Sequence, residues 1–310
     1  MNANLNLGDL DSKGFIHIPN FLSLDEINLL KLDYENRSNN DNDNYPVKDI
    51  GPEAFAHMRK KFSWLPDEIE KKTNIHVDTL LSGAYFATEL GLYFSWHQDY
   101  ESYYLNQDRL NYLNLYLTIR KPNVEKTNLK IIPFDILKKN APAFAEQRWG
   151  GGASILKKFE KTWFARTNDK GGFFSLTFDP EKIAVTPQFR EGDLLIMRGD
   201  LIHRTEDSET NRVALSLRMI SSKSRLSLKK LSRFDFTKLS LMYNNPVPYF
   251  HLFEMFEYSG KKEVSYGEYQ KNFRELEARK KINAPSGEEK ITKIKLFFKH
   301  AKAWLSTLSR

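Results

Sequence analysis

The chain contains no cysteine, which excludes a disulfide framework and any zinc site built from thiolates. No run of 18 apolar residues occurs in its 310 residues, so the sequence predicts no membrane-spanning helix. The first ten residues show no basic segment followed by an apolar one, and we therefore expect no secretory signal. With neither feature, the expected location is cytoplasmic.

Acidic residues are absent from the last 21 positions, where six basic residues occur. The net charge of +7 comes mostly from this segment, because removing its six cations from 47 leaves 41 basic against 40 acidic residues. The rest of the chain is nearly neutral, and a basic pI that comes from one terminal segment does not indicate nucleic-acid binding by the core. We predict no nucleic-acid partner.

What the chain does contain is enough apolar material for a sizeable core. Hydrophobic residues make up 40% of it and aromatic residues 13%, a composition typical of folded rather than disordered chains. The length favours one large domain with an appendage. We predict a main domain over residues 1–222 and a helical C-terminal extension over 223–310.

A His-x-Asp pair follows an apolar run at residues 94–100. Residues i and i+2 of a strand point to the same face, so His97 and Asp99 can reach one metal ion while Gln98 points away. A second apolar stretch after a Gly-Asp turn ends at His203, which must come from another strand. Two histidines and one carboxylate are the ligands of the facial triad that holds Fe(II) and leaves positions open for 2-oxoglutarate and O2.

The strand that follows carries two arginines on one face. That face reads Arg212, Ala214, Ser216 and Arg218, and the opposite face is apolar. Arginine offers two donors in a plane, which suits the far carboxylate of 2-oxoglutarate better than lysine does. The two arginine Cα atoms lie about 20 Å apart at about 3.3 Å per residue. They are therefore not expected to hold the same carboxylate.

Residues 110–119 alternate between polar and apolar positions. Tyr112, Asn114, Tyr116 and Thr118 share one face. This face is either the wall of a buried site or a solvent-exposed surface. On the first interpretation Tyr112 and Asn114 are candidate co-substrate contacts. Trp96 and Tyr100, beside the His-x-Asp pair, are candidate substrate contacts.

These stretches together resemble the phytanoyl-CoA dioxygenase-like branch of the 2-oxoglutarate oxygenases over roughly residues 12–220. Gly14–Ser23 is similar to the entry strand and first helix of that family, and residues 192–203 resemble its distal-histidine strand. Residues 128–133 match its Asn-Gly…Pro-Gly-Ser-His segment only in part, because Pro133-Phe134-Asp135 stands where that family continues with Gly-Ser-His.

The resemblance implies an α+β fold, a double-stranded β-helix (jelly-roll, cupin-like) core flanked by helices. It implies Fe(II) bound by His97, Asp99 and His203, and 2-oxoglutarate held by Arg212, since the family places that arginine near the start of its final strand. Arg218 then supports the site or contacts substrate. Halogenating relatives replace the carboxylate by a small residue, so Asp99 implies hydroxylation, or a related oxidation, of a small-molecule substrate.

Two segments outside the motifs have alternative interpretations. Residues 120–190, with glycine runs at 150–152 and 171–172, are either a lid over the site or a surface insertion. The last helix, from residue 286, carries an apolar stripe opposed by lysines. It could dock on the protein or on a second subunit, or lie on an anionic membrane surface.

Three other functions stay open on the sequence alone. The triad could hold zinc in a hydrolase, the barrel could bind metal without catalysis, or the oxygenase could act on a lipid-linked substrate at a membrane. The remaining histidines stand in no such pattern and are given no role: His17, His57, His76, His251 and His300.

Overall fold

The computed structural model describes residues 6–39, 47–91, 93–147, 154–166, 173–232, 238, 242 and 247–283. The chain divides into two compact units, residues 1–103 with 108–221 and residues 104–107 with 222–310. Within the described residues no helix is both long and apolar enough to cross a membrane. The predicted glycine hinges at 150–152 and 171–172 and the predicted last helix lie outside the described residues.

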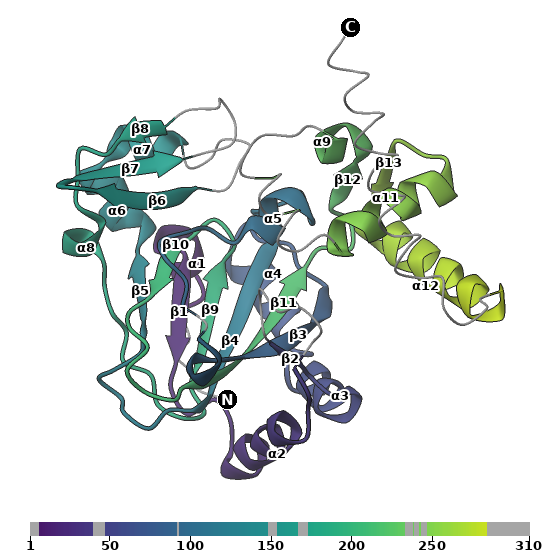
Figure 1. The fold of residues 1–310 in the computed structure, drawn as a ribbon, viewed down its shortest axis with the longest axis horizontal. Coiled ribbons are helices and arrows are strands. Elements are labelled where there is room, and N and C mark those ends of the chain that lie inside the picture. Colours follow the sequence, from purple (N-terminus) through teal and green to yellow (C-terminus); the bar gives the residue numbers. More distant parts are fainter. Residues whose placement is uncertain are drawn as a thin grey trace, which may run out of the picture. The chain divides into compact units, whose positions relative to one another are not determined.

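A six-stranded antiparallel sheet forms the centre of the first unit (Figure 1). Its strands, in spatial order, are β1 (Phe15–Ile18), β9 (Leu194–Arg198), β4 (Tyr112–Arg120), β11 (Val213–Ile220), β3 (Thr79–Ala87) and β2 (Lys48–Asp49). Neighbours in this order come from distant parts of the sequence, so the sheet joins the N-terminal strand to the strands that carry the candidate motifs.

A second layer of short strands contains the histidine-bearing segments. In it β5 (Leu129–Ile132) pairs with β10 (Ile202–Thr205), and β6 (Ile155–Phe159), β7 (Thr162–Arg166) and β8 (Phe173–Ser175) form a small antiparallel sheet. His97 bridges both groups, because it pairs with His203 on β10 and with Ile155 on β6. The segment around His97 therefore acts as the strand that completes this layer.

Helices cover one face of the large sheet. The odd-numbered residues of β4, Leu113 to Leu117, are buried in one cluster with residues of α2 (Leu24–Glu35), α3 (Pro52–Lys61) and α4 (Leu65–Lys72). The remaining helical segments of this unit are α1 (Asp9–Ser12), η1 (Thr88–Leu90), α5 (Tyr100–Tyr104, which crosses into the second unit), α6 (Phe134–Asn140), α7 (Pro142–Gln147) and α8 (Pro180–Ile183).

The other face of the large sheet packs against the second layer. Tyr116 on β4 and Ala214 on β11 share an apolar cluster with Leu129 and Ile131 of β5. Asn114, Tyr116 and Thr118 are only 5%, 6% and 1% exposed. The interpretation of this face as a solvent surface is therefore wrong, and the polar residues of β4 lie between the two layers.

Residues 52–72 form two helices and not one. α3 ends at Lys61 and α4 begins at Leu65, with Pro66 in its first turn. Proline has no N–H to donate, and its ring clashes with the carbonyl four residues before it, here that of Phe62. A capping box opens α2 at Ser23, because the Ser23 hydroxyl accepts from the Glu26 N–H while the Glu26 carboxylate accepts from the Ser23 N–H.

The second unit is mostly helical. It contains the hairpin of β12 (Arg225–Ser227) and β13 (Glu263–Ser265), with α9 (Leu228–Ser232), α11 (Val247–Ser259) and α12 (Tyr266–Asn283). A capping box opens α12, with reciprocal hydrogen bonds between Ser265 and Glu268.

Candidate metal centre

Two histidines lie directly opposite each other in the second layer. The N–H of His97 donates to the carbonyl of His203, and the N–H of His203 donates to that of His97, both at 2.9 Å. Side chains of directly opposite residues project from the same face of a sheet. The two imidazole rings accordingly lie with their centroids 4.4 Å apart. The backbone pairing alone thus brings the two predicted ligands together.

Hydrogen bonds to the backbone fix which nitrogen of each ring is available. His97 Nδ1 lies 2.7 Å from the Ser95 carbonyl oxygen, and His203 Nδ1 lies 3.0 Å from that of Leu201. A carbonyl only accepts, so each Nδ1 carries a proton, and in the neutral form of either ring the lone pair is on Nε2. Burial and the neighbouring His203 lower the pKa of His97 to about 4. His97 is therefore neutral at pH 7, the state that binds a metal.

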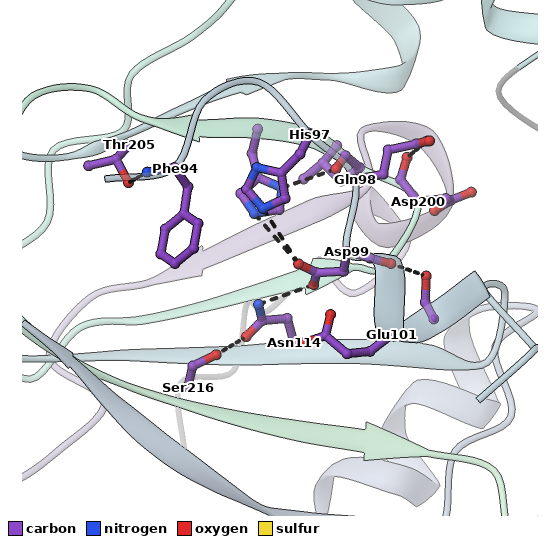
Figure 2. A network of polar contacts seen from close by, with 12 residues as sticks. Phe94, His97, Gln98, Asp99, Glu101, Asn114, Asp200, Thr205 and Ser216 are labelled. Carbon is purple, nitrogen blue, oxygen red and sulfur yellow. Dashed lines mark hydrogen bonds and ion pairs between the residues drawn. The ribbon is translucent and has the colours of Figure 1, made fainter. Parts of the chain in front are cut away.

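Asp99 completes the group, and its Oδ1 faces both rings (Figure 2). This oxygen lies 4.0 Å from His97 Nε2 and 3.8 Å from His203 Nε2. Two atoms that are each about 2.1 Å from one ion lie at most about 4.2 Å apart, so both separations can be bridged by a single ion. Among the described residues this is the one cluster of three or more histidines and carboxylates with ligand atoms within 4.8 Å of one another.

Gln98 points away from the triad and anchors the segment that carries it. Its side chain donates to the Asp200 carbonyl at 2.6 Å and accepts from the Ser154 N–H at 2.8 Å. The backbone N–H of Asp99 donates to the Gly199 carbonyl at 3.1 Å. Gln98 is 1% exposed, so its hydrogen bonds are shielded from water. His97 and Asp99 are therefore presented by a backbone held on both sides.

A buried polar network extends from the other oxygen of Asp99. Asn114 Nδ2 donates to Asp99 Oδ2 at 3.3 Å, and Asn114 Oδ1 accepts from Ser216 Oγ at 2.7 Å and from Arg218 Nη1 at 3.1 Å. Arg218 also pairs with Glu101 at 3.8 Å. The predicted residues Asn114 and Arg218 thus lie beside Asp99.

Tyr112 belongs to the same end of the site. It is 2% exposed, and burial raises its pKa well above the ordinary value for tyrosine, an effect that the nearby Arg218 opposes. The sequence grouped Tyr112 and Asn114 with Arg212 as co-substrate contacts. The structure instead places both of them near Arg218.

Arg212 lies further along the inner face and is 3% exposed. Its Nη1 donates to the Thr127 carbonyl at 3.3 Å, and its guanidinium carbon lies 5.7 Å from the centre of the Tyr116 ring. Among the described residues, no donor or acceptor is aligned to hydrogen-bond with the buried Arg212 Nε or with the hydroxyls of Tyr116 and Thr118, although Arg212 lies close enough to oppose the rise in the Tyr116 pKa that burial causes. Burial and Arg212 lower the pKa of nearby Lys121 to about 8. A buried cation here is thus accompanied by unused donors.

Tyr116 and Thr118 were not among the predicted site residues, although the alternation of β4 places them on the face of Asn114. Trp96 was predicted to contact substrate, but its ring lies in the apolar cluster with α6 and α7 and its Nε1 donates to Glu181 at 2.8 Å. Its placement supports a packing role and not substrate contact. Tyr100 begins α5 directly after Asp99 and is half-buried.

The triad is most accessible at His97. The His97 side chain is 22% exposed, whereas those of Asp99 and His203 are each 7% exposed. The Phe94 ring lies 5.7 Å from the His97 ring (Figure 2). Three donors on one side of a bound ion leave its other positions for exchangeable ligands. Those ligands would reach the ion on the side of His97 and Phe94.

A comparison with models of protein families finds no match, and neither does a comparison with curated proteins. Among solved structures, the non-heme alpha-ketoglutarate-dependent carbocyclase SnoK from nogalamycin biosynthesis is similar at 14% identity and a TM-score of 0.46, covering 70% of this chain and 83% of its own. HygX from Streptomyces hygroscopicus, solved with nickel and 2-oxoglutarate, is similar at 16% identity and a TM-score of 0.44; the match covers 70% of this chain and 86% of HygX. A Pseudomonas putida prolyl-4-hydroxylase is similar at 11% identity and a TM-score of 0.43; the match covers 70% of this chain and 97% of the hydroxylase.

Proposed function

We propose that this chain is a non-haem Fe(II)- and 2-oxoglutarate-dependent dioxygenase whose two sheet layers form a double-stranded β-helix. The observation that carries the proposal is the combination of two features on the same inner face. One is the triad of His97, Asp99 and His203, with both imidazole lone pairs available. The other is the buried Arg212 with an unused donor.

The donor set favours iron over the alternatives. Two imidazoles and one carboxylate with open positions form the facial arrangement of non-haem Fe(II) oxygenases. The residue that separates the oxygenase from the zinc hydrolase alternative is Arg212, which supplies a buried cation on the same inner face. A buried cation is costly unless an anion pairs with it. A dicarboxylate co-substrate would meet that need.

The spacing along β4 suits 2-oxoglutarate. Asn114 marks the end of the strand near Asp99, and Tyr116 lies beside Arg212. From Asn114 the strand rises about 7 Å to Tyr116 and about 13 Å to Thr118. A metal–ligand bond of about 2 Å, a five-carbon chain of roughly 5 Å and a hydrogen bond of about 3 Å together span about 10 Å. Arg212 would hold the distal carboxylate, with the hydroxyls of Tyr116 and Thr118 next to it.

The roles of the protein groups follow from their surroundings. Bound iron with 2-oxoglutarate and O2 supplies the oxidising power, with succinate and CO2 as products. His97, Asp99 and His203 hold the metal from one side, while Arg212 fixes the co-substrate. The cluster that includes Tyr116, Leu129 and Ile131 keeps water from the co-substrate end. The chain thus contributes positioning and exclusion of water.

We further propose hydroxylation of an aliphatic C–H in a small-molecule substrate. The retained carboxylate at Asp99 supports oxidation rather than halogen transfer, because it occupies the position where a halide would bind. Access on the side of Phe94 supports a substrate with an apolar portion near the reacting carbon. The alternative of a lipid-linked substrate depends on the segment after residue 286.

An anaerobic titration of the apo-protein with Fe(II) and 2-oxoglutarate tests the proposal. We expect a weak visible charge-transfer band in the wild type, its loss in His97→Ala, and its retention in His76→Ala. His76 is a matched control because its side chain is 61% exposed and pairs with Glu70 outside the triad. Under O2 the wild type should then release succinate. Metal binding without a band at any 2-oxoglutarate concentration would contradict the proposal and favour the hydrolase or binding-protein alternatives.

A further inference from the structure

The two oxygens of Asp99 have different surroundings, although both are buried. Oδ1 faces His97 Nε2 at 4.0 Å and His203 Nε2 at 3.8 Å. Oδ2 faces away from the rings and accepts from Asn114 Nδ2 at 3.3 Å. Asp99 and Asn114 are each 5% exposed, so bulk water does not compete for this contact. The carboxylate therefore meets the metal position with one defined oxygen.

The orientation of the Asn114 amide is set by its other partners. A guanidinium carries only donors, so the Asn114 atom that meets Arg218 must be the carbonyl oxygen. Ser216 donates to the same oxygen at 2.7 Å, and Arg218 does so at 3.1 Å. A reversed amide would place its NH2 against Arg218 and its oxygen against the Asp99 carboxylate. Both contacts would be repulsive.

Strand register places these groups together. Arg218 on β11 lies directly opposite Asn114 on β4, and Ser216 lies two residues along the same face. Opposite residues in an antiparallel pair have Cβ atoms about 4.5–5.5 Å apart, within reach of one another. The large sheet therefore delivers both donors to Asn114 without help from loops.

We infer that Asn114, with its amide orientation fixed by Arg218 and Ser216, is a positioning residue that makes Asp99 a one-oxygen ligand of the metal. The inference rests on the metal site of the proposed function. By occupying Oδ2, the amide keeps Asp99 from chelating through both oxygens, which leaves more positions of the ion for exchangeable ligands. Arg218 acts on the metal through Asn114 and is not itself a ligand.

The test uses Co(II) alone as the probe, with the full chain and no co-substrate. Dissociation constants and visible absorption spectra are measured for wild type, Asn114→Leu and Arg218→Met. We expect affinity to fall about 10- to 100-fold in both variants, the range found when groups that orient metal ligands are removed, with an altered spectrum. Leu115→Val is the control, because Leu115 is a neighbour on β4 that faces the helices, and it should keep the wild-type constant.

Conservative variants separate positioning from general destabilisation. Lysine also only donates, so Arg218→Lys should stay closer to the wild type than Arg218→Met does. Ser216→Ala removes one of two donors to the Asn114 oxygen and should weaken Co(II) binding less than Arg218→Met does. If Asn114→Leu does not fold, the variants Ser216→Ala and Arg218→Met test the positioning role of Asn114. Unchanged Co(II) dissociation constants and spectra in Arg218→Met and Ser216→Ala would overturn this inference but not the proposed function. A wild type that binds no Co(II) would overturn both this inference and the proposed function.

Discussion

Replacing Arg212 by glutamine should weaken 2-oxoglutarate binding far more than it weakens metal binding. Arg212 is 3% exposed, so the co-substrate carboxylate would be left in a site without its cation. Leaving a buried charge unpaired costs about 3–5 kcal/mol, and each 1.4 kcal/mol is about a factor of ten in affinity. We therefore expect a loss of about 100- to 4,000-fold. The nearby Lys121, with a pKa of about 8, is mostly protonated at pH 7 and favours the lower value.

The assay is the anaerobic charge-transfer titration, with 2-oxoglutarate varied at saturating Fe(II). Arg212→Lys keeps a charge but not the two planar donors and should lose less affinity than Arg212→Gln. The matched control is Arg120→Gln, since Arg120 pairs with Glu35 at 2.9 Å and its side chain is 31% exposed. A co-substrate constant for Arg212→Gln within twofold of the wild type, with Fe(II) affinity intact, would refute the assignment of Arg212.

Three further predictions concern the scaffold. Burial alone would raise the pKa of Glu26, but hydrogen bonds from Lys61 and other groups outweigh burial and lower that pKa from 4.5 to about 2. The ionised Glu26 therefore stabilises the fold fully above pH 4.5, and this stabilisation is lost as the pH falls toward 2. In urea unfolding, Glu26→Gln should lower the free energy of unfolding by about 1–3 kcal/mol at pH 7 and by little at pH 2. Gly83→Ala should lower the melting temperature, because its Cβ would lie 2.0 Å from the Ser216 carbonyl oxygen and overpacking costs about 1–3 kcal/mol. Trp96→Phe should lose about 1–2 kcal/mol with its indole hydrogen bond yet keep wild-type Co(II) affinity; a large loss of affinity would show that Trp96 does more than pack.

The sequence predicted the metal triad because its signal is local. A His-x-Asp pair needs only the two-residue period of a strand, and His203 follows a Gly-Asp turn and an apolar run. The same period predicted which residues of β4 share a face. It could not tell which partner each would meet, because that depends on the register between β4 and β11, which are about a hundred residues apart.

The co-substrate end shows this limit most clearly. Register places Arg218 opposite Asn114, and a shift between Val213 and Ala214 changes the pairing near Arg212. Tyr112 lies opposite Ile220, at the other end of β11 from Arg212, and Tyr116 lies at the Arg212 guanidinium instead. Irregularities of this kind depend on tertiary packing, and a single sequence carries no direct signal for them.

The direct backbone pairing of His97 with His203 also constrains when a metal ion can enter the triad. The two residues are 106 positions apart, and contacts of such long range form late because the intervening loop must close first. Before His203 pairs with His97, only His97 and Asp99 of the triad are close together, and two ligands bind a metal ion weakly. Metal loading is thus expected to follow assembly of the second layer, and bound iron should slow the exchange of the two amide protons that join these histidines.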